Sequence, residues 1–389
     1  MNPPPAVQPA HPARHYDAIV LGAGIVGAAC AHALALAGLH VAVVERHGIG
    51  HGDTSAGMGH IVAMDDSPAQ LALTRYGQTL WDDLAPNLPP AAEFQRCGTL
   101  WIAATDAELV EAQRKQAVYA AHNIPTSLLD ANSLANAEPN LSPFFYGALH
   151  VPSDSALHPT SAAQFLLDQA LLHRTELFLG HAALAAAHGR VLLDDNTQIH
   201  APILINATGV FAPSLTPGIP VRRRKGHLVL TGPRPGFVHH QLVELGYLAS
   251  AHATLEDSVA FNVQPRLGGQ LCIGSSRQFD AETSTVDETI LAAMLARAAS
   301  YLPGIETLST QRVWTGFRAA TPDKLPLIGP AATHNDQPDP TLFLATGHEG
   351  LGGTTALATA QLLAGHILNR PTAIPIAPYL PARFAQQHP

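Results

Sequence analysis

Three glycines near the N-terminus, Gly22, Gly24 and Gly27, have the spacing G-x-G-x-x-G, and an acidic residue, Glu45, follows the last of them by 18 residues. In a strand–turn–helix unit the first glycine permits a tight turn, the second lets the backbone approach a pyrophosphate, and the third lets the helix pack closely on the strand. An acidic residue at this distance can accept hydrogen bonds from the ribose hydroxyls of an adenosine. The spacing therefore predicts dinucleotide binding. Glu45 disfavours the 2′-phosphate of NADPH but does not separate FAD from NAD.

The elements that would position these residues can be read from the same stretch. The apolar run Ala18 to Leu21 predicts a buried parallel strand, and Ile25 to Ala37 is a proline-free segment rich in Ala and Leu, which favour a helix. His40 to Val44 predicts the second strand. Because the first turn of such a helix directs free N–H groups at a phosphate, we expect Ile25, Val26 and, after the second strand, Arg46 beside the cofactor.

Two further stretches of small residues could lie against a nucleotide. Thr54 and Ser55 occupy a glycine-rich loop after the second strand, where their hydroxyls could donate to phosphate or ribityl oxygens, although an ordinary connection is the alternative. The run ILINATG ends a buried strand at Ala207, Thr208 and Gly209, where a backbone without bulky side chains can lie flat against a ligand.

Composition sets limits on the class of protein. The chain has 389 residues, of which 47% are hydrophobic and only 13% charged, with a formal net charge of −9. This length suits two domains, and the acidic balance argues against a nucleic-acid partner. The 22 histidines show no spacing typical of metal ligands, and three distant cysteines indicate neither a disulfide scaffold nor a zinc site, so no metal is expected.

The N-terminus and the apolar runs bear on location. Residues 1–15 are proline-rich without an apolar core segment, which predicts a disordered leader rather than a signal peptide. No apolar run reaches the roughly 18 residues that span a bilayer. We therefore expect a cytoplasmic protein without an integral membrane segment; peripheral membrane contact stays open.

Four stretches together resemble the FAD-dependent amine oxidoreductases of the D-amino acid oxidase superfamily, which includes glycine oxidase, sarcosine oxidase and D-amino acid dehydrogenases. These are GAGIVG to ER (22–46), INATG (205–209), WTGFRAATPDKLPLIGP (314–330) and ATGHEGLGGTTA (345–356). They stand in the order and at separations similar to the family's, across nearly the whole chain. Singly each is weak, and together they are more specific for the superfamily than for a substrate.

The resemblance implies an α/β fold with a Rossmann-type FAD-binding domain and a second, antiparallel-sheet α+β substrate domain. The FAD-binding domain would be discontinuous, comprising 16–85, 146–219 and 311–385, and the substrate domain would comprise 86–145 and 220–310.

The resemblance also implies roles for residues near the C-terminus. A helix beginning near Gly352 would direct its N-terminal N–H groups at the flavin edge that becomes negative on reduction. The segment expected at the isoalloxazine is Thr346 to Thr354, with Gly347, Gly350, Leu351, Gly352, Gly353 and Thr354 as its contact residues. Some relatives attach the flavin covalently through a cysteine in the block that here reads GFRAAT. Because this block contains no cysteine, FAD should be bound noncovalently.

Arg318 matches the family position that holds the substrate carboxylate, for which a guanidinium fork is well suited; the alternative is a structural arginine paired with Asp323. Tyr247 matches loosely the tyrosine that relatives place over the substrate. The chain departs from the family pattern at Lys225-Gly226-His227, where Arg-Gly-Gln is usual. It also departs near Gly57–Met58, where the asparagine that follows the family's nucleotide loop is replaced. The charge run Arg222 to Lys225 could bind an anion or form a solvated edge.

The implied reaction is oxidation of the C–N bond of a small amino acid by hydride transfer to flavin N5, giving an imine. A D-amino acid is the first choice of substrate, with D-proline and hydroxy-D-proline as cyclic candidates, and glycine or sarcosine is the alternative within the class. Rival interpretations are a flavin-binding subunit of a heteromeric dehydrogenase complex and an NAD-dependent dehydrogenase. Whether oxygen or a quinone reoxidises the flavin, and whether the chain forms homo- or hetero-oligomers, stays open.

Overall fold

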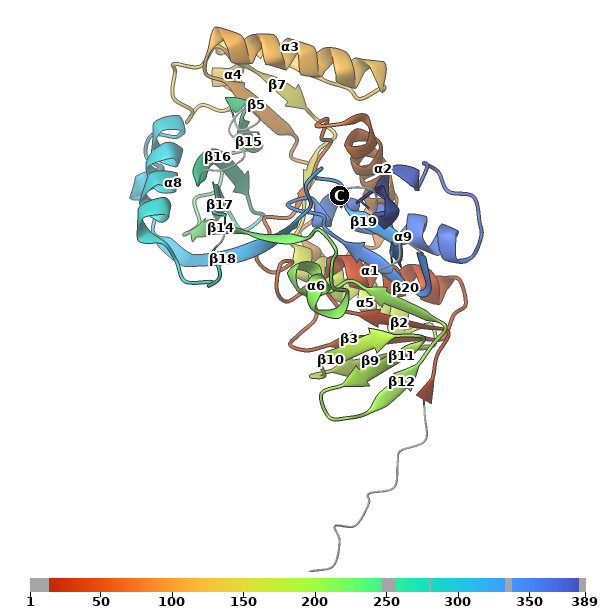
Figure 1. Ribbon diagram of the computed structural model, residues 1–389. Coiled ribbons are helices and arrows are strands. Elements are labelled where there is room, and N and C mark those ends of the chain that lie inside the picture. Colours follow the sequence, from red (N-terminus) through yellow and green to blue (C-terminus); the bar gives the residue numbers. More distant parts are fainter. Residues whose placement is uncertain (1–13, 247–256, 280, 333–337, 385–389) are drawn as a thin grey trace, which may run out of the picture.

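The computed structural model describes residues 14–246, 257–279, 281–332 and 338–384 (Figure 1). Within these residues, two large sheets are joined by long strands, and a smaller sheet covers one of them. The cofactor motifs lie on the first large sheet, and most of the expected substrate block lies on the second.

The first large sheet has six strands drawn from the N-terminal, middle and C-terminal parts of the chain. In spatial order they are β19 (Leu327–Ala332), β20 (Pro338–Thr346), β13 (Ile203–Asn206), β2 (Ala18–Leu21), β3 (Val41–Glu45) and β9 (Thr175–Leu179). All neighbouring pairs are parallel except β19 with β20. The sheet confirms the expected Rossmann-type unit.

The central strands β2, β3 and β13 are buried on both faces of the sheet, which explains why they are continuous apolar runs. On β2, Ala18 and Val20 enter the core on the helical side, and Ile19 and Leu21 enter the core on the opposite side. The helices of the first core are α1 (Ile25–Leu36), α2 (Pro68–Leu84), α5 (Pro159–Leu171) and α9 (Gly352–Ile367). Ser67 caps α2 by accepting a hydrogen bond from Gln70 N–H.

The opposite face is covered by a four-stranded sheet. Its order is β1 (Arg14–His15), β12 (Gln198–His200), β11 (Arg190–Leu193) and β10 (Ala183–Ala187). The prediction of a disordered leader over residues 1–15 is wrong at residues 14 and 15, which form β1 and pair in parallel with β12. Edge pairing uses backbone groups and needs no side-chain pattern, so it cannot be predicted from residue types. Residues 1–13 lie outside the described residues.

The second large sheet has eight strands. In order they are β18 (Thr310–Ala320), β14 (Arg222–Thr231), β17 (Leu271–Arg277), β16 (Ser258–Pro265), β15 (Gln241–Glu244), β5 (Thr99–Ala103), β7 (Gly147–Val151) and β6 (Ser127–Asp130). The sheet is antiparallel except that β15 and β5 are parallel, which refines the expected all-antiparallel arrangement.

Helices cover both faces of this sheet (Figure 1). On β5, Leu100 and Ile102 share a core with α8 (Glu288–Tyr301) and α4 (Ala131–Ala137). The alternate residues Trp101 and Ala103 pack with α3 (Asp106–Ala121). A two-stranded ribbon, β4 (His60–Ile61) with β8 (Ser155–Ala156), and the short helix α6 (Ala212–Leu215) complete the named strands and α-helices.

Strands β14 and β18 link the two halves. Their register runs from Arg222 opposite Ala320 to Thr231 opposite Thr310. At one end Ala319 enters a core of the six-stranded sheet, and at the other Val229 enters the core of the eight-stranded sheet. We propose the expected discontinuous division into FAD-binding and substrate domains, with β7 and β18 assigned to the substrate sheet with which they pair.

Among the described residues, no helix combines the length and the apolar character needed to cross a bilayer.

Candidate functional site

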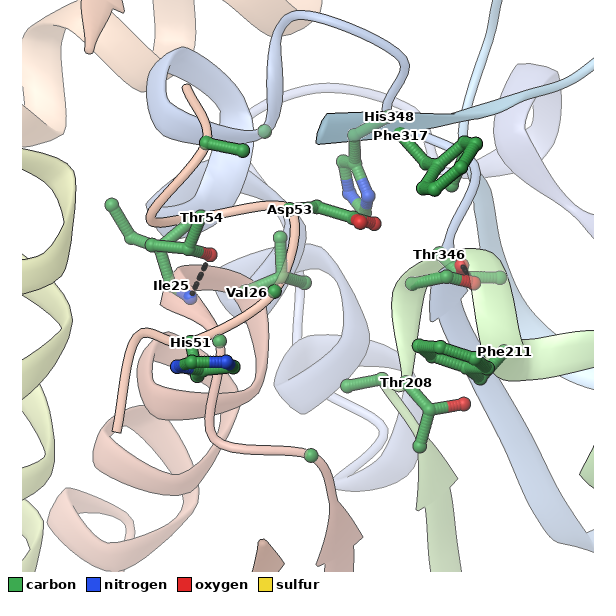
Figure 2. Close-up of a pocket in the computed structure, with 18 of the residues that line it drawn as sticks. Ile25, Val26, His51, Asp53, Thr54, Thr208, Phe211, Phe317, Thr346 and His348 are labelled. Atoms are coloured by element: carbon green, nitrogen blue, oxygen red, sulfur yellow. Dashed lines mark hydrogen bonds between the residues drawn. The ribbon is translucent and has the colours of Figure 1, made fainter. Parts of the chain in front are cut away.

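The carboxyl ends of β2, β3, β13 and β20 meet at a cavity of about 550 Å³ (Figure 2). This is the usual place for a nucleotide on an open parallel sheet. The cavity brings together most of the residues expected from the sequence: Gly22, Gly24, Ile25, Val26, Glu45, Arg46, Thr54, Ala207, Thr208, Gly209, Arg318, Gly347, Gly350, Gly352 and Gly353.

Four expected residues are placed differently, and a fifth is not described. Gly27 packs inside the turn, and Ser55 donates its hydroxyl to the carbonyl of Gly52. Thr354 is fully buried and bonds to the carbonyl of His60, and Leu351 lines a neighbouring smaller cavity. Tyr247 lies outside the described residues. Thr354 and Ser55 therefore support the loops around the cavity instead of forming its wall.

The glycine turn has the close contacts that its pattern requires. A Cβ atom on Gly27 would stand 1.9 Å from the carbonyl oxygen of Gly22, so the third glycine allows helix and strand to touch. Gly22 has φ +98°, and a Cβ there would approach the Ala207 carbonyl oxygen to 2.7 Å. A Cβ on Gly24 would lie 3.1 Å from Thr54 Oγ1, so this glycine faces the loop as well as the cavity.

Glu45 is oriented by the backbone around it. One of its carboxylate oxygens accepts from Ala23 N–H at 2.8 Å and the other from His47 N–H at 2.8 Å. Each oxygen keeps a further lone pair for a ribose hydroxyl. The residue thus both braces the glycine turn and lines the cavity.

Thr54 acts at the N-terminus of α1, as Figure 2 shows. Its Oγ1 accepts a hydrogen bond from Ile25 N–H at 3.0 Å, and its own hydroxyl hydrogen stays available to a ligand. One of the helix's free N–H groups is therefore taken by the protein, and that of Val26 lies next along the turn.

The helix α9 begins at Gly352 without a side-chain cap at Leu351. Gly352 and Gly353 line the cavity, so the positive end of the helix is beside it. Gly347 has φ +81°, and a Cβ there would stand 2.7 Å from Thr321 Cγ2, which explains a glycine at this turn. The arrangement favours negative charge at this end of the cavity.

Asp53 adjoins the expected Thr54 and lines the cavity, but it belongs to no motif from which it could be predicted. In Figure 2 its carboxyl group points toward the side that carries Phe317 and Thr346. Asp53 Oδ2 accepts from Val210 N–H at 3.3 Å. Burial raises the pKa of this carboxyl to about 7, against the opposing effects of that N–H and of the Arg223 charge.

His348 also lines the cavity, within the expected glycine turn. Its Nε2 lies 2.9 Å from Thr359 Oγ1, and burial lowers its pKa to about 3, so the ring is neutral at physiological pH. Other wall residues missing from the sequence prediction are His51, Phe211 and Phe317 (Figure 2). Phe317 adjoins Arg318 in one of the matching stretches, whereas Phe211 and His51 belong to no motif and are brought to the site only by the three-dimensional structure.

A second cavity of about 110 Å³ adjoins the first. Five residues line both: His60, Asn262, Arg318, Glu349 and Gly350. The smaller cavity therefore lies at the end that carries the C-terminal glycine turn. It also receives Trp101 from β5 and Lys324, which forms an ion pair of 3.2 Å with Asp66.

Arg318 stands between the two cavities on β18. Its Nη1 donates to the carbonyl of Ser276 at 3.0 Å, and its guanidinium lies over Gly226 on β14. Asp323, the alternative partner considered from sequence, instead forms an ion pair with Arg383 at 2.7 Å. This placement suits a side chain that binds a carboxylate entering the smaller cavity.

The run Arg222 to Lys225 is distributed over several structural contacts. Arg224 forms an ion pair with Glu349, Lys225 Nζ donates to the carbonyl of Thr285, and Arg223 lies over the rings of Phe211 and Phe317. We therefore assign these cations to bracing the site rather than to a separate anion site.

With this geometry established, comparison with known proteins identifies the family. Residues 17–365 match the family model described as FAD dependent oxidoreductase, DAO. The chain belongs to this family. The prediction of a FAD-dependent oxidoreductase with a Rossmann-type cofactor domain is thus confirmed.

Two curated relatives match over nearly their full length. The hydrogen cyanide synthase subunit HcnC of Pseudomonas aeruginosa is 27% identical, with 95% of this chain and 97% of that protein covered. Glycine oxidase of the same organism is 27% identical, with 94% and 98% covered. Among solved structures, L-proline dehydrogenase from P. horikoshii has a TM-score of 0.86 at 22% identity, with 97% of this chain and 99% of that chain covered, and this likeness concerns the fold.

The residues of the large cavity fit FAD. The glycine turn and Thr54 are placed for the phosphates, Glu45 for a ribose, and the uncapped α9 terminus for the flavin ring. Cys30, Cys97 and Cys272 are all described, and none lines this cavity. The noncovalent attachment expected from the sequence stays a prediction.

Proposed function

We propose that this enzyme oxidises the C–N bond of a small amino acid. The observation that carries the proposal is the position of Arg318 on the wall shared by the FAD cavity and the smaller cavity of about 110 Å³. A carboxylate bound by this guanidinium would leave the α-carbon near the flavin end of the larger cavity. Relatives named glycine oxidase and D-amino acid dehydrogenase support the same class of reaction.

When bound, FAD supplies the acceptor for the hydride that leaves the substrate α-carbon. The chain's own part is to hold and orient the substrate. Arg318 fixes the carboxylate, and the buried walls formed by Trp101 and Val243 limit water around the side chain. The product imine is released and hydrolysed in water, which needs no further protein group.

We propose a D-amino acid as the substrate, with D-proline and hydroxy-D-proline first. Glycine and sarcosine are the alternatives within the class. The small volume of the second cavity supports a small or cyclic side chain over a long one. Either oxygen or a quinone would reoxidise the flavin, and we place the reaction in the cytoplasm.

An anaerobic bleaching screen tests the proposal. Purified protein carrying FAD would be mixed with D-proline, hydroxy-D-proline, other D-amino acids, glycine and sarcosine, and loss of the oxidised flavin absorbance would be followed. We expect rapid bleaching by at least one of them and slow or no bleaching by the corresponding L-isomer. Failure of every amino acid to bleach the flavin would refute the proposal.

A second candidate function is a flavin-binding subunit of a heteromeric dehydrogenase complex. The observation that favours it is the similarity to HcnC, which is itself named as a subunit. Bleaching by the isolated chain at a rate comparable with steady-state turnover would argue against a passive subunit. Turnover that appears only with added protein fractions from the source cell would favour it.

A further inference from the structure

A network of side-chain amides surrounds His60, one of the residues shared by both cavities. His60 lies on β4, and its Nδ1 contacts Gln241 Oε1 from β15. Its Nε2 lies 3.1 Å from Nδ2 of Asn262 on β16. The direction of each hydrogen bond decides which atom of Asn262 is left for a ligand.

A backbone carbonyl fixes one end of this network. Gln241 Nε2 lies 3.1 Å from the carbonyl oxygen of Ser155, which can only accept. The amide of Gln241 must therefore present Oε1 to His60. Since Oε1 only accepts, His60 Nδ1 carries the hydrogen and Nε2 holds a lone pair.

At the other end of the network, a guanidinium fixes the orientation of the Gln264 amide. Arg266 Nη1, which can only donate, lies 3.2 Å from Gln264 Oε1. The Nε2 of Gln264 then donates to Gln241 Oε1 at 3.1 Å, and its contact with His60 Nδ1 is longer, at 3.3 Å. Burial lowers the pKa of His60, with support from the nearby Arg266 charge, so the ring stays neutral and the pattern holds.

Asn262 is consequently oriented by His60. Because His60 Nε2 accepts, Asn262 must donate through Nδ2, and its Oδ1 is turned away from the ring. That oxygen is buried and has no hydrogen-bond partner among the described residues. Leaving a buried acceptor unsatisfied is costly, so a donor from a bound molecule would be strongly favoured there.

We propose that Asn262 Oδ1 accepts a hydrogen bond from the N–H of the substrate amine, and that His60 is the positioning residue that keeps this acceptor facing the ligand. The inference rests on the proposed function and deepens it. Asn262 and Arg318 line the same two cavities, so one substrate can engage the arginine with its carboxylate and the asparagine with its amine. The site selects primary and secondary amines over oxygen isosteres, which offer a lone pair where the amine has a hydrogen.

The test uses two flat aromatic ligands, neither of which has the saturated α-carbon that a substrate would need for oxidation. Pyrrole-2-carboxylate presents an N–H beside its carboxylate, and furan-2-carboxylate presents an oxygen at the same place. Each would be titrated into the holoenzyme while the flavin absorbance is followed. We expect the pyrrole to bind about tenfold more tightly or better, as one hydrogen bond of about 1.4 kcal/mol implies.

Variants separate the amine contact from the carboxylate contact. Asn262→Leu should bring the ratio of the two dissociation constants close to one, whereas Asn262→Asp, which keeps an acceptor, should retain the preference. Arg318→Ala should weaken both ligands alike and leave their ratio unchanged. His60→Phe should reduce the ratio by freeing the amide to turn. Flavin content and melting temperature would be measured for each variant.

Equal binding of the two ligands to the wild-type protein, or an unchanged ratio in Asn262→Leu, would overturn the assignment. So would absence of binding by both ligands. These results are independent of turnover, because neither ligand is a substrate. A positive bleaching screen together with an unchanged ratio would therefore retain the amino acid oxidation and reject the role of Asn262.

Discussion

The guanidinium of Arg318 lies against the α-carbon of Gly226 on the neighbouring strand. A methyl group at Gly226 would stand 2.6 Å from Nη1 and 2.9 Å from Nη2. Because the contacted atoms are the far end of a flexible side chain, the arginine can move while the strands stay paired. The glycine of the Lys-Gly-His segment is thus explained by the side chain that crosses it.

Gly226→Ala should therefore displace Arg318 without unfolding the protein. We expect normal flavin content, a nearly unchanged melting temperature and a KM raised about tenfold or more for a carboxylate substrate. Gly48→Ala is the matched control, because a Cβ at Gly48 meets nothing within 4 Å. Normal kinetics in Gly226→Ala would show that the position of the guanidinium is not critical.

Arg318→Ala should keep FAD and lower kcat/KM for carboxylate substrates. Loss of hydrogen bonds to a charged partner costs about 1.5–3 kcal/mol or more for a bidentate pair, which is roughly tenfold to a few hundredfold. Arg318→Lys should recover only part of this loss, since an ammonium lacks the planar fork. Arg312→Ala, an exposed position on the same strand, is the control. An equal loss for an amine without a carboxylate would indicate a structural role instead.

Gly24→Val should give protein depleted in FAD. The nearest protein atom to a Cβ at Gly24 is Thr54 Oγ1 at 3.1 Å, so the larger side chain would push on the residue that bonds Ile25 N–H and fill space at the turn. The ratio of flavin to protein absorbance measures the effect, with Gly48→Ala again as control. Full flavin content in Gly24→Val would place the phosphates elsewhere.

Asp53 should make the stability of FAD-free protein depend on pH. Its folded pKa of about 7 is above the unfolded value, so the native state holds the extra proton and loses stability as pH rises from about 4 to about 7. The shift corresponds to at most about 4 kcal/mol. Asp53→Asn should flatten this decline in melting temperature between pH 5 and 8, whereas Asp83→Asn, at an exposed position on α2, should not. A parallel decline in both variants would contradict the prediction.

FAD should leave the protein on acid precipitation. None of the three cysteines lines the cavity, so no thiol is placed to form a thioether with the flavin. The supernatant after precipitation should contain all of the yellow colour. Flavin that stays in the pellet would reveal a covalent bond.

The features that the sequence predicted well are local ones. The turn at Gly22 and Gly27 and the acid at Glu45 follow from one short strand–helix–strand unit, in which each residue's environment is set by near neighbours. Helix α9 begins at Gly352, where its start was expected from the glycine-rich turn.

Features that depend on distant contacts were missed. Strand β6 passes directly into helix α4, because pairing with β7 extends as far as Asp130, which caps the helix. Asp53 and Asn262 carry no motif, and only folding brings them to the same cavity. The parallel pairing of β15 with β5 likewise joins segments more than a hundred residues apart.

The long ladder between β14 and β18 has a consequence for how ligands reach the buried site. Its ends are anchored in two different cores, so a hinge rotation of one half of the molecule against the other would have to bend this continuous ladder and disturb the packing at both ends. Moving a few side chains disturbs far fewer contacts. Substrate exchange is therefore expected to proceed through local rearrangements at the cavity rim, such as parting of the Asp66–Lys324 ion pair, while the two halves keep a fixed relative orientation.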